Sequence, residues 1–217
     1  MECLEHIISC YGYLGEYGSV IKYSDRYLEL DKNNINVFIY KAQALLVFEK
    51  YEEALDYYDL ALNCDSKNII ALTGKAYVLL KLEKDILFLE HCDRVLAVDS
   101  TNNHILYFLS LFYFRLNQFD LALKFINESL DVEENNFPSL LLKAKILTKQ
   151  EAYDKALPIL NKLLIVDPVN IEVLFLKAIV LRNMGENYEA KECINYILEL
   201  DENYDDALDL RESLEEF

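Results

Sequence analysis

The sequence predicts an all-α fold of stacked helical hairpins. Three observations support this. A pattern of apolar and small residues recurs every 34 residues, and each period carries two stripes of apolar residues at helical spacing. The chain also has only 5 Gly and 3 Pro in 217 residues, too few for the many turns of an all-β fold.

The period divides the chain into six units without insertion or deletion. The units are residues 1–34, 35–68, 69–102, 103–136, 137–170 and 171–204, and residues 205–217 remain. Below, "position" means the place of a residue within its unit. Position 28 is Leu in all six units, and position 31 is always acidic: Asp31, Asp65, Asp99, Glu133, Asp167 and Asp201. Six copies in phase establish the repeat.

Each unit is expected to form two helices, at about positions 2–14 and 18–30. Positions 4, 7, 8 and 11 form one helical stripe, and positions 20, 21, 24, 27 and 28 form a second. Neither helix buries its stripe alone, whereas stacked neighbours bury it for each other. We therefore expect residues 1–217 to form a single solenoid.

The units differ in detail. In residues 137–170, Pro138 suits the first turn of a helix and Pro168 ends the second helix. Phe88 stands at position 20, where neighbouring units have Ala54, Ala122 and Ala156, so that hairpin is splayed or shifted in register near residues 84–86. The first unit begins inside a helix with no visible N-terminal cap. Residues 205–217 are expected to form a capping helix with one acidic face.

The pattern resembles the tetratricopeptide repeat, a 34-residue helical hairpin. Its small and aromatic positions are matched in the second unit by Phe38, Ala42, Ala54, Tyr58 and Ala61. Further matches are Ala144, Tyr153, Ala156 and Pro168 in the fifth unit, and Ala178, Gly185 and Ala190 in the sixth. The resemblance implies a right-handed superhelix in which the first helix of each hairpin lines a concave groove.

Charge and cysteine content limit the function classes. The chain has 38 acidic and 21 basic residues, a net charge of −17, which disfavours nucleic acid and anionic lipid as partners. Its five cysteines form no CxxC pair, so free thiols in a reducing cytoplasm are expected. No apolar run approaches the ~18–20 residues of a membrane span.

The sequence predicts no enzyme. His6, His91 and His104 lie in no metal-ligand spacing, and Gly12, Gly15 and Gly18 lack the strand that a phosphate-binding loop requires. We expect no catalytic residue, metal or cofactor.

A further set of first-helix residues, which we call the groove residues, points to partner binding. They stand mainly at positions 5, 6, 9, 12 and 13, where an isolated hairpin has no reason to place apolar side chains. Apolar and aromatic groove residues would bury a partner's side chains, and basic ones would fix its acidic groups. The set is Ile39, Tyr40, Gln43, Tyr77, Lys81, Tyr107, Phe108, Leu111, Phe114, Arg115, Leu141, Lys145, Lys149, Phe175, Ile179 and Arg182.

The function predicted is a protein–protein interaction scaffold that binds a peptide or helix of a partner. Alternatives are homo-oligomerisation through the uncapped first unit, regulation of an enzyme in trans, and, less favoured by the charge, recognition of RNA by helical repeats. Tetratricopeptide grooves that clamp a terminal carboxylate use Asn and Lys at positions 2, 5, 6 and 9. Here Asn36, Ile39, Tyr40 and Gln43 stand at those positions, so this clamp does not carry over.

Overall fold

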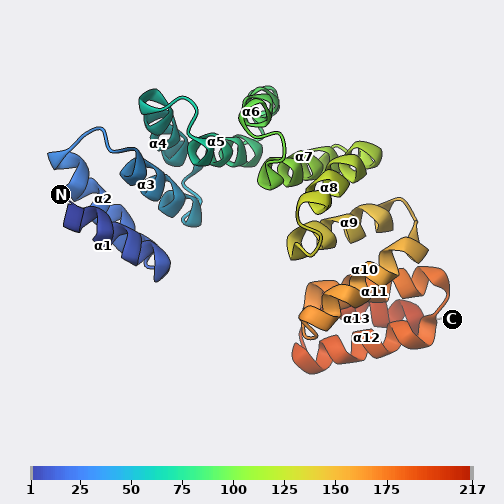
Figure 1. Cartoon of the computed structure of the whole chain (residues 1–217). Coiled ribbons are helices and arrows are strands. Elements are labelled where there is room, and N and C mark those ends of the chain that lie inside the picture. The colour runs from blue at the N-terminus through green and yellow to red at the C-terminus, as the bar shows by residue number, and fades with distance from the viewer. Residues whose placement is uncertain (1, 216–217) are drawn as a thin grey trace. The chain divides into compact units, whose positions relative to one another are not determined.

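The computed structural model describes residues 2–215, with side chains through residue 214, and residues 1 and 216–217 lie outside this description. Within residues 2–215 the chain forms thirteen helices and no strand (Figure 1). It divides into two compact units, Met1–Phe108 and Leu109–Phe217. The predicted all-α hairpin fold is confirmed, and the expectation that the six hairpins form one solenoid remains a prediction.

The helices follow the 34-residue frame closely. The first compact unit contains α1 (Glu2–Tyr13), α2 (Tyr17–Leu30), α3 (Ile35–Val47), α4 (Tyr51–Cys64), α5 (Ile69–Lys81) and α6 (Asp85–Val98). The boundary falls within α7 (Asn103–Arg115). The second contains α8 (Phe119–Val132), α9 (Phe137–Lys149), α10 (Tyr153–Val166), α11 (Ile171–Met184), α12 (Asn187–Leu200) and α13 (Asp205–Glu215).

Packing within each compact unit follows chain order. From α1 to α5 and from α8 to α13, each helix contacts the next one along the chain. First helices of successive hairpins also touch, as in α1 with α3, α3 with α5, and α9 with α11. This nearest-neighbour pattern is typical of helical repeats.

The turn inside each hairpin places position 15 in the left-handed region. The residues there are Gly15, Glu49, Glu83, Asn117, Glu151 and Gly185, with φ between 53° and 84°. The next residue donates its backbone N–H to the carbonyl of position 11, as Lys50 does to Leu45 at 3.0 Å and Glu186 to Leu181 at 2.9 Å. This six-to-one bond closes the helix end in the manner of a Schellman motif.

The links between hairpins are built from Asp and Asn. Asn68 caps α5, because its Oδ1 accepts the backbone N–H of Ala71 at 3.1 Å. Asp65, just before it, accepts the backbone N–H of Lys67 at 3.0 Å. The same Asn cap begins the first helix at Asn34, Asn102, Asn136 and Asn170. The acidic position 31 and Asn at position 34 thus fix where each hairpin begins.

Phe88 is accommodated without a change of register. Helix α6 begins at Asp85, position 17, as the second helix does in every other hairpin, and Phe88 is fully buried. The register shift near residues 84–86, one of the two expected outcomes, does not occur. In the first hairpin, the large residues Ile8, Val20 and Tyr27 at usually small positions are also buried, and they form one core cluster.

The capping helix is present as α13. Ala207, Leu210 and Leu214 are buried in one cluster with residues of α11 and α12, including Leu181 and Ile194. The predicted helix over 205–217 is therefore described as far as Glu215, and its last two residues lie outside the described part of the chain.

Candidate partner-binding site

In the first compact unit, four groove residues gather in one aromatic cluster. The ring centroids of Tyr77 and Phe108 are 5.4 Å apart, and those of Tyr107 and Phe108 are 6.1 Å apart. Lys81 Nζ lies 5.5 Å from the centroid of the Tyr77 ring, a cation–π geometry. Residues of α5 and α7 are therefore in contact on one side of the hairpins.

Exposure separates the groove residues of this compact unit into two groups. Ile39 and Phe108 are buried; Ile39 contributes to packing, whereas Phe108 also lines a pocket. Tyr40, Tyr77 and Tyr107 are half-buried, whereas Gln43 and Lys81 are exposed. Any partner would meet the edges of these rings and the two polar groups.

A pocket of about 430 Å³ lies beside the aromatic cluster. It is bounded by α3, α5 and α7, with Gln43 and Tyr77 among the groove residues that line it. Gly74, at position 6 of its unit, and Tyr58 of α4, which is not a groove residue, also line it. A pocket of this size can hold a large side chain or a small ligand.

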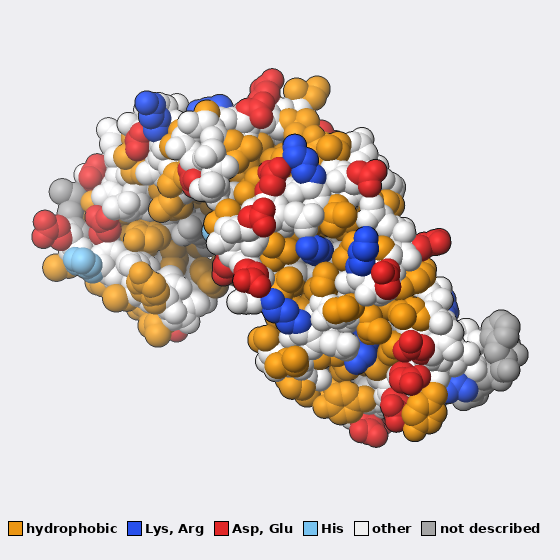
Figure 2. Space-filling view, turned by 45° about the vertical axis from the view of Figure 1, so that its right-hand side comes forward, with side chains coloured by type: hydrophobic (Ala, Val, Ile, Leu, Met, Phe, Trp, Pro, Cys, Tyr) orange, Lys and Arg blue, Asp and Glu red, His pale blue; other side chains and the backbone are white. Residues whose placement is uncertain are grey.

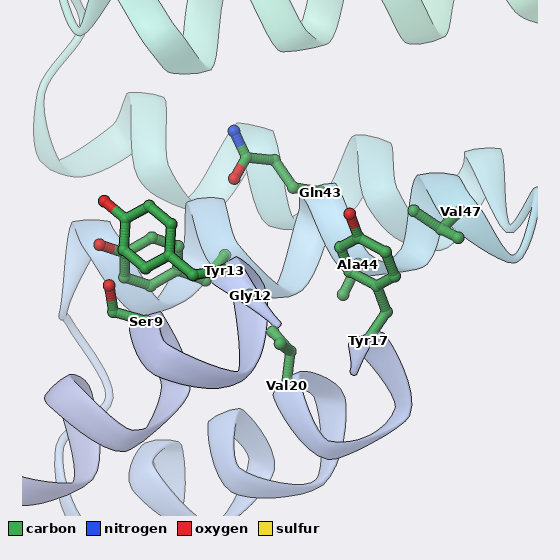
Figure 3. Close-up of a pocket in the computed structure, with 9 residues that line it drawn as sticks. Ser9, Gly12, Tyr13, Tyr17, Val20, Gln43, Ala44 and Val47 are labelled. Carbon is green, nitrogen blue, oxygen red and sulfur yellow. The ribbon is translucent and has the colours of Figure 1, made fainter. Parts of the chain in front are cut away.

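A second pocket, of about 390 Å³, lies between α1, α2 and α3. Figure 3 shows Tyr13 of α1 and Tyr17 of α2 directed toward α3, where Ala44 and Val47 form the opposite wall. Gln43 lines both pockets of the first compact unit. The predicted groove residues include Tyr40 and Gln43 of this lining but none of its residues from the first repeat.

In the second compact unit, Leu111, Phe114 and Leu141 are half-buried. The Phe114 ring packs against Phe119 at the turn of its hairpin, with centroids 5.8 Å apart. Leu141 packs on the core cluster of α9 and α10. These apolar groove residues are thus partly covered by their own hairpins and partly exposed.

Three further groove residues meet the capping helix. Phe175, Ile179 and Arg182 line a shallow pocket of about 310 Å³ together with Asp206 and Asp209 of α13. Arg182 Nη1 also lies 3.4 Å from the hydroxyl of Ser213. The acidic contribution of α13 to this pocket was not predicted.

The predicted basic set is less available to a partner than its sequence suggested. Lys145 forms an ion pair with Glu172, and Arg182 shares its pocket with two aspartates. Arg115 lies 5.5 Å from the centroid of the Phe112 ring. Figure 2 likewise shows basic side chains interspersed with acidic ones on the visible face. Lys81 and Lys149 are exposed and remain candidates for contact with an acidic partner.

Among the described residues, no helix has both the length and the hydrophobicity needed to cross a membrane.

Two protein families match parts of the sequence. Residues 89–163 match the family described as anaphase-promoting complex, cyclosome, subunit 3, and residues 171–204 match the tetratricopeptide repeat. The second match coincides with the sixth unit of the frame read from the sequence. No curated protein sequence matches the chain.

Solved structures of several tetratricopeptide proteins resemble the fold. A tetratricopeptide repeat protein from Parabacteroides merdae is 21% identical, with 98% of this chain and 84% of that chain covered and a TM-score of 0.74. Another tetratricopeptide protein, YrrB, described as having an unusual peptide-binding site, is 21% identical, with coverages of 87% and 97% and a TM-score of 0.66.

A chain of the APC/C hetero-tetramer Cut9–Hcn1 is 15% identical, with coverages of 97% and 42% and a TM-score of 0.86. At these identities the structures establish a shared fold and nothing more. Together with the in-phase repeat and the two family matches, they show that the chain is built of tetratricopeptide-type helical hairpins.

Proposed function

We propose that the chain is a non-enzymatic interaction scaffold that binds a peptide or helix of a partner protein through its groove residues. The observation that carries the proposal is the partial exposure of Tyr77, Tyr107 and Phe175 beside pockets. Aromatic side chains in this setting are typical anchors of protein interfaces. The match to the tetratricopeptide repeat supports the role of an interaction scaffold. The description of YrrB, as having an unusual peptide-binding site, supports a peptide as the ligand.

Only some of the basic groove residues are available to a partner. Exposed Lys81 and Lys149 would contact acidic groups of the partner, whereas paired Lys145 would have to exchange Glu172 for such a group. A cytoplasmic location is part of the proposal. It is supported by five free cysteines, three of them exposed, which are typical of a reducing compartment.

The test is a comparison of groove and control variants. The protein is immobilised, partners are captured from cell extract, and the affinity for a purified partner is then measured. We expect Tyr77→Glu with Leu111→Glu to weaken binding by more than about tenfold, since a buried carboxylate at an interface costs at least ~1.4 kcal/mol.

The matched control is Ile86→Glu with Ile165→Glu, which places the same charges at side chains 76% and 82% exposed and outside the groove set. Control and wild type should bind alike, and circular dichroism should show equal helix content in all three. Equal affinity of the groove variant and wild type would overturn the proposal.

A second candidate function is self-association through the first hairpin. It is favoured by Tyr13 and Leu14 at the turn of that hairpin, whose side chains are 90% and 73% exposed. Light scattering over a dilution series measures this directly. Self-association predicts a concentration-dependent mass that Tyr13→Ser with Leu14→Ser abolishes, and a constant monomer mass would exclude it.

A further inference from the structure

The floor of the 430 Å³ pocket in the first compact unit is formed where the Tyr58 ring packs against Gly74. Gly74 of α5 has no side chain, and the Tyr58 ring of α4 fills the space that a side chain there would occupy. A Cβ at Gly74 would lie 2.3 Å from Cζ of Tyr58 and 2.5 Å from its hydroxyl oxygen. The phenol of Tyr58 therefore reaches from the second helix of one hairpin to the groove face of the next.

The hydroxyl of Tyr58 has an unused hydrogen bond. The residue is only 1% exposed and lines the pocket, and no hydrogen bond of its hydroxyl is found among the described residues. Burial raises the pKa of this phenol above its ordinary value, so it stays a neutral donor. A hydrogen-bond acceptor on a ligand in the pocket can pair with this donor.

The walls of the pocket select an aromatic occupant. The Tyr77 and Phe108 rings lie 5.4 Å apart, and His104 lies 6.5 Å from Phe108. Ile69, Ile70 and Leu46 complete the apolar lining. A flat ring gains more from such walls than an aliphatic side chain does, because edge-to-face contacts add to the burial of apolar area.

Charge selects a neutral occupant. No Asp, Glu, Lys or Arg is among the residues that line the pocket. A carboxylate would enter without a lysine or arginine to pair with, in a chain of net charge −17. An ammonium group would likewise meet no carboxylate. The polar side chains that line the pocket are Gln43, Tyr58, Thr73, Tyr77, Asn102 and His104.

We propose that this pocket receives the side chain of a tyrosine on the partner segment. The inference rests on the proposed function and specifies one contact of the bound segment. The partner's ring lies among Tyr77, Phe108 and Ile70, and its phenol oxygen accepts the hydrogen bond of Tyr58. Phenylalanine would fill the same space but leave that donor unsatisfied.

The experiment uses the full chain and two small probes, N-acetyl-tyrosinamide and N-acetyl-phenylalaninamide, titrated by amide chemical-shift changes. We expect saturable shifts at Gly74 and Thr73, with the tyrosine probe bound about tenfold more tightly than the phenylalanine probe. In Tyr58→Phe the preference should vanish while the phenylalanine probe binds as before.

The matched control is Tyr57→Phe, which removes a neighbouring phenol that lies outside the pocket and should keep the preference. Nuclear Overhauser contacts from the probe ring to Gly74 locate the site directly, whatever the stability of the variants. Absence of saturable binding, equal affinities in the wild type, or a preference that survives Tyr58→Phe would overturn the proposal.

The two proposals fail in different ways. Loss of partner binding in the groove variants without probe binding at Gly74 would remove the tyrosine pocket and leave the scaffold. Probe binding at Gly74 with unchanged partner binding in the groove variants would leave the pocket and remove the proposed function.

Discussion

The ring of Tyr58 occupies the volume that any side chain at Gly74 would need, with only 2.3 Å between Tyr58 Cζ and the place of a Cβ at Gly74. The two residues are 16 positions apart, on the second helix of one hairpin and the first helix of the next. The same offset joins Lys41 to Asp25 and Lys75 to Asp59. One geometric relation thus governs the joint between successive hairpins in the first compact unit.

Gly74→Ala should therefore destabilise the protein although it improves helix propensity. Alanine in the middle of α5 gains about 1 kcal/mol over glycine, whereas a methyl group forced against the buried Tyr58 ring costs about 1–3 kcal/mol. We expect a net loss of about 1 kcal/mol in the free energy of unfolding, measured by urea denaturation.

The control is the same substitution in a Tyr58→Leu background, where the ring is absent. There Gly74→Ala should stabilise by about 1 kcal/mol, because only the propensity gain remains. An equal effect in both backgrounds would show that the two residues do not compete for space.

Position 15 offers a gain in stability. Glu49 and Glu151 adopt φ of 56° and 59°, a region that costs most residues about 1–2 kcal/mol and glycine almost nothing. Glu49→Gly and Glu151→Gly should each raise the free energy of unfolding by about 1 kcal/mol and add when combined. The measurement is the denaturation midpoint, with the exposed Glu52→Gly inside α4 as a control that should lower it.

The sequence predicted the hairpins because their determinants are local and repeated. Helix stripes, the acidic position 31 and the small residues at the hairpin interface recur six times, so each repeat confirms the others. Asn at position 34 is a preferred N-cap residue, so it also indicates where the first helix of the next hairpin begins. The left-handed backbone conformation at position 15 was harder to predict. Glycine, which favours that conformation, is present only as Gly15 and Gly185, and three other hairpins have glutamate there.

The site was less predictable because it depends on pairs of residues. Tyr77 could be assigned to the groove from its position, but the burial of Ile39 and Phe108 depends on neighbouring hairpins. The pairing of Lys145 with Glu172 joins two hairpins and changes the charge that a partner meets. Tyr58 matches an aromatic position of the repeat, and it reaches the pocket because Gly74 has no side chain to block it.

Removing Asp25 should lower the free energy of unfolding more than removing Lys41, its partner in an ion pair. Lys41 is only 8% exposed in its side chain and also donates to the Tyr57 hydroxyl, whereas the Asp25 side chain is 56% exposed. Asp25→Ala leaves a buried ammonium group with one neutral partner and should cost about 2 kcal/mol in unfolding free energy. Lys41→Met leaves a solvated carboxylate and should cost less than about 1 kcal/mol.

The pair also predicts a dependence on alkaline pH. Burial lowers the pKa of Lys41, but the hydrogen bonds to Asp25 and Tyr57 outweigh it and raise the pKa above the ordinary 10.5. Stability from the pair is thus fully present below pH 10.5 and is lost as pH rises through the folded-state pKa. Lys41→Met should lose less stability than wild type over that range, and parallel pH curves would contradict the assignment.

His91 should make the first compact unit sensitive to acid. The residue is buried, and Arg94 Nη1 lies 3.1 Å from its Nε2 while its Nδ1 lies 3.2 Å from the carbonyl of Leu87. These contacts suit a neutral ring that donates from Nδ1 and accepts from Arg94 at Nε2. Burial, followed by the positive charges of Lys75 and Arg94, lowers the pKa of His91 below its ordinary 6.5. The hydrogen bond to the Leu87 carbonyl and the charge of Asp59 oppose this less strongly.

A histidine with a lowered pKa takes up its proton more readily in the unfolded chain, so its contribution to stability is complete above pH 6.5. That contribution is lost as pH falls from 6.5 through the folded-state pKa. We expect the free energy of unfolding to fall more steeply between pH 7 and pH 5.5 in wild type than in His91→Gln, which titrates no proton there. His104→Gln, at an exposed position, serves as the control and should keep the wild-type slope. Equal slopes for wild type and His91→Gln would show that His91 can be protonated in place, with Arg94 free to move away from its ring.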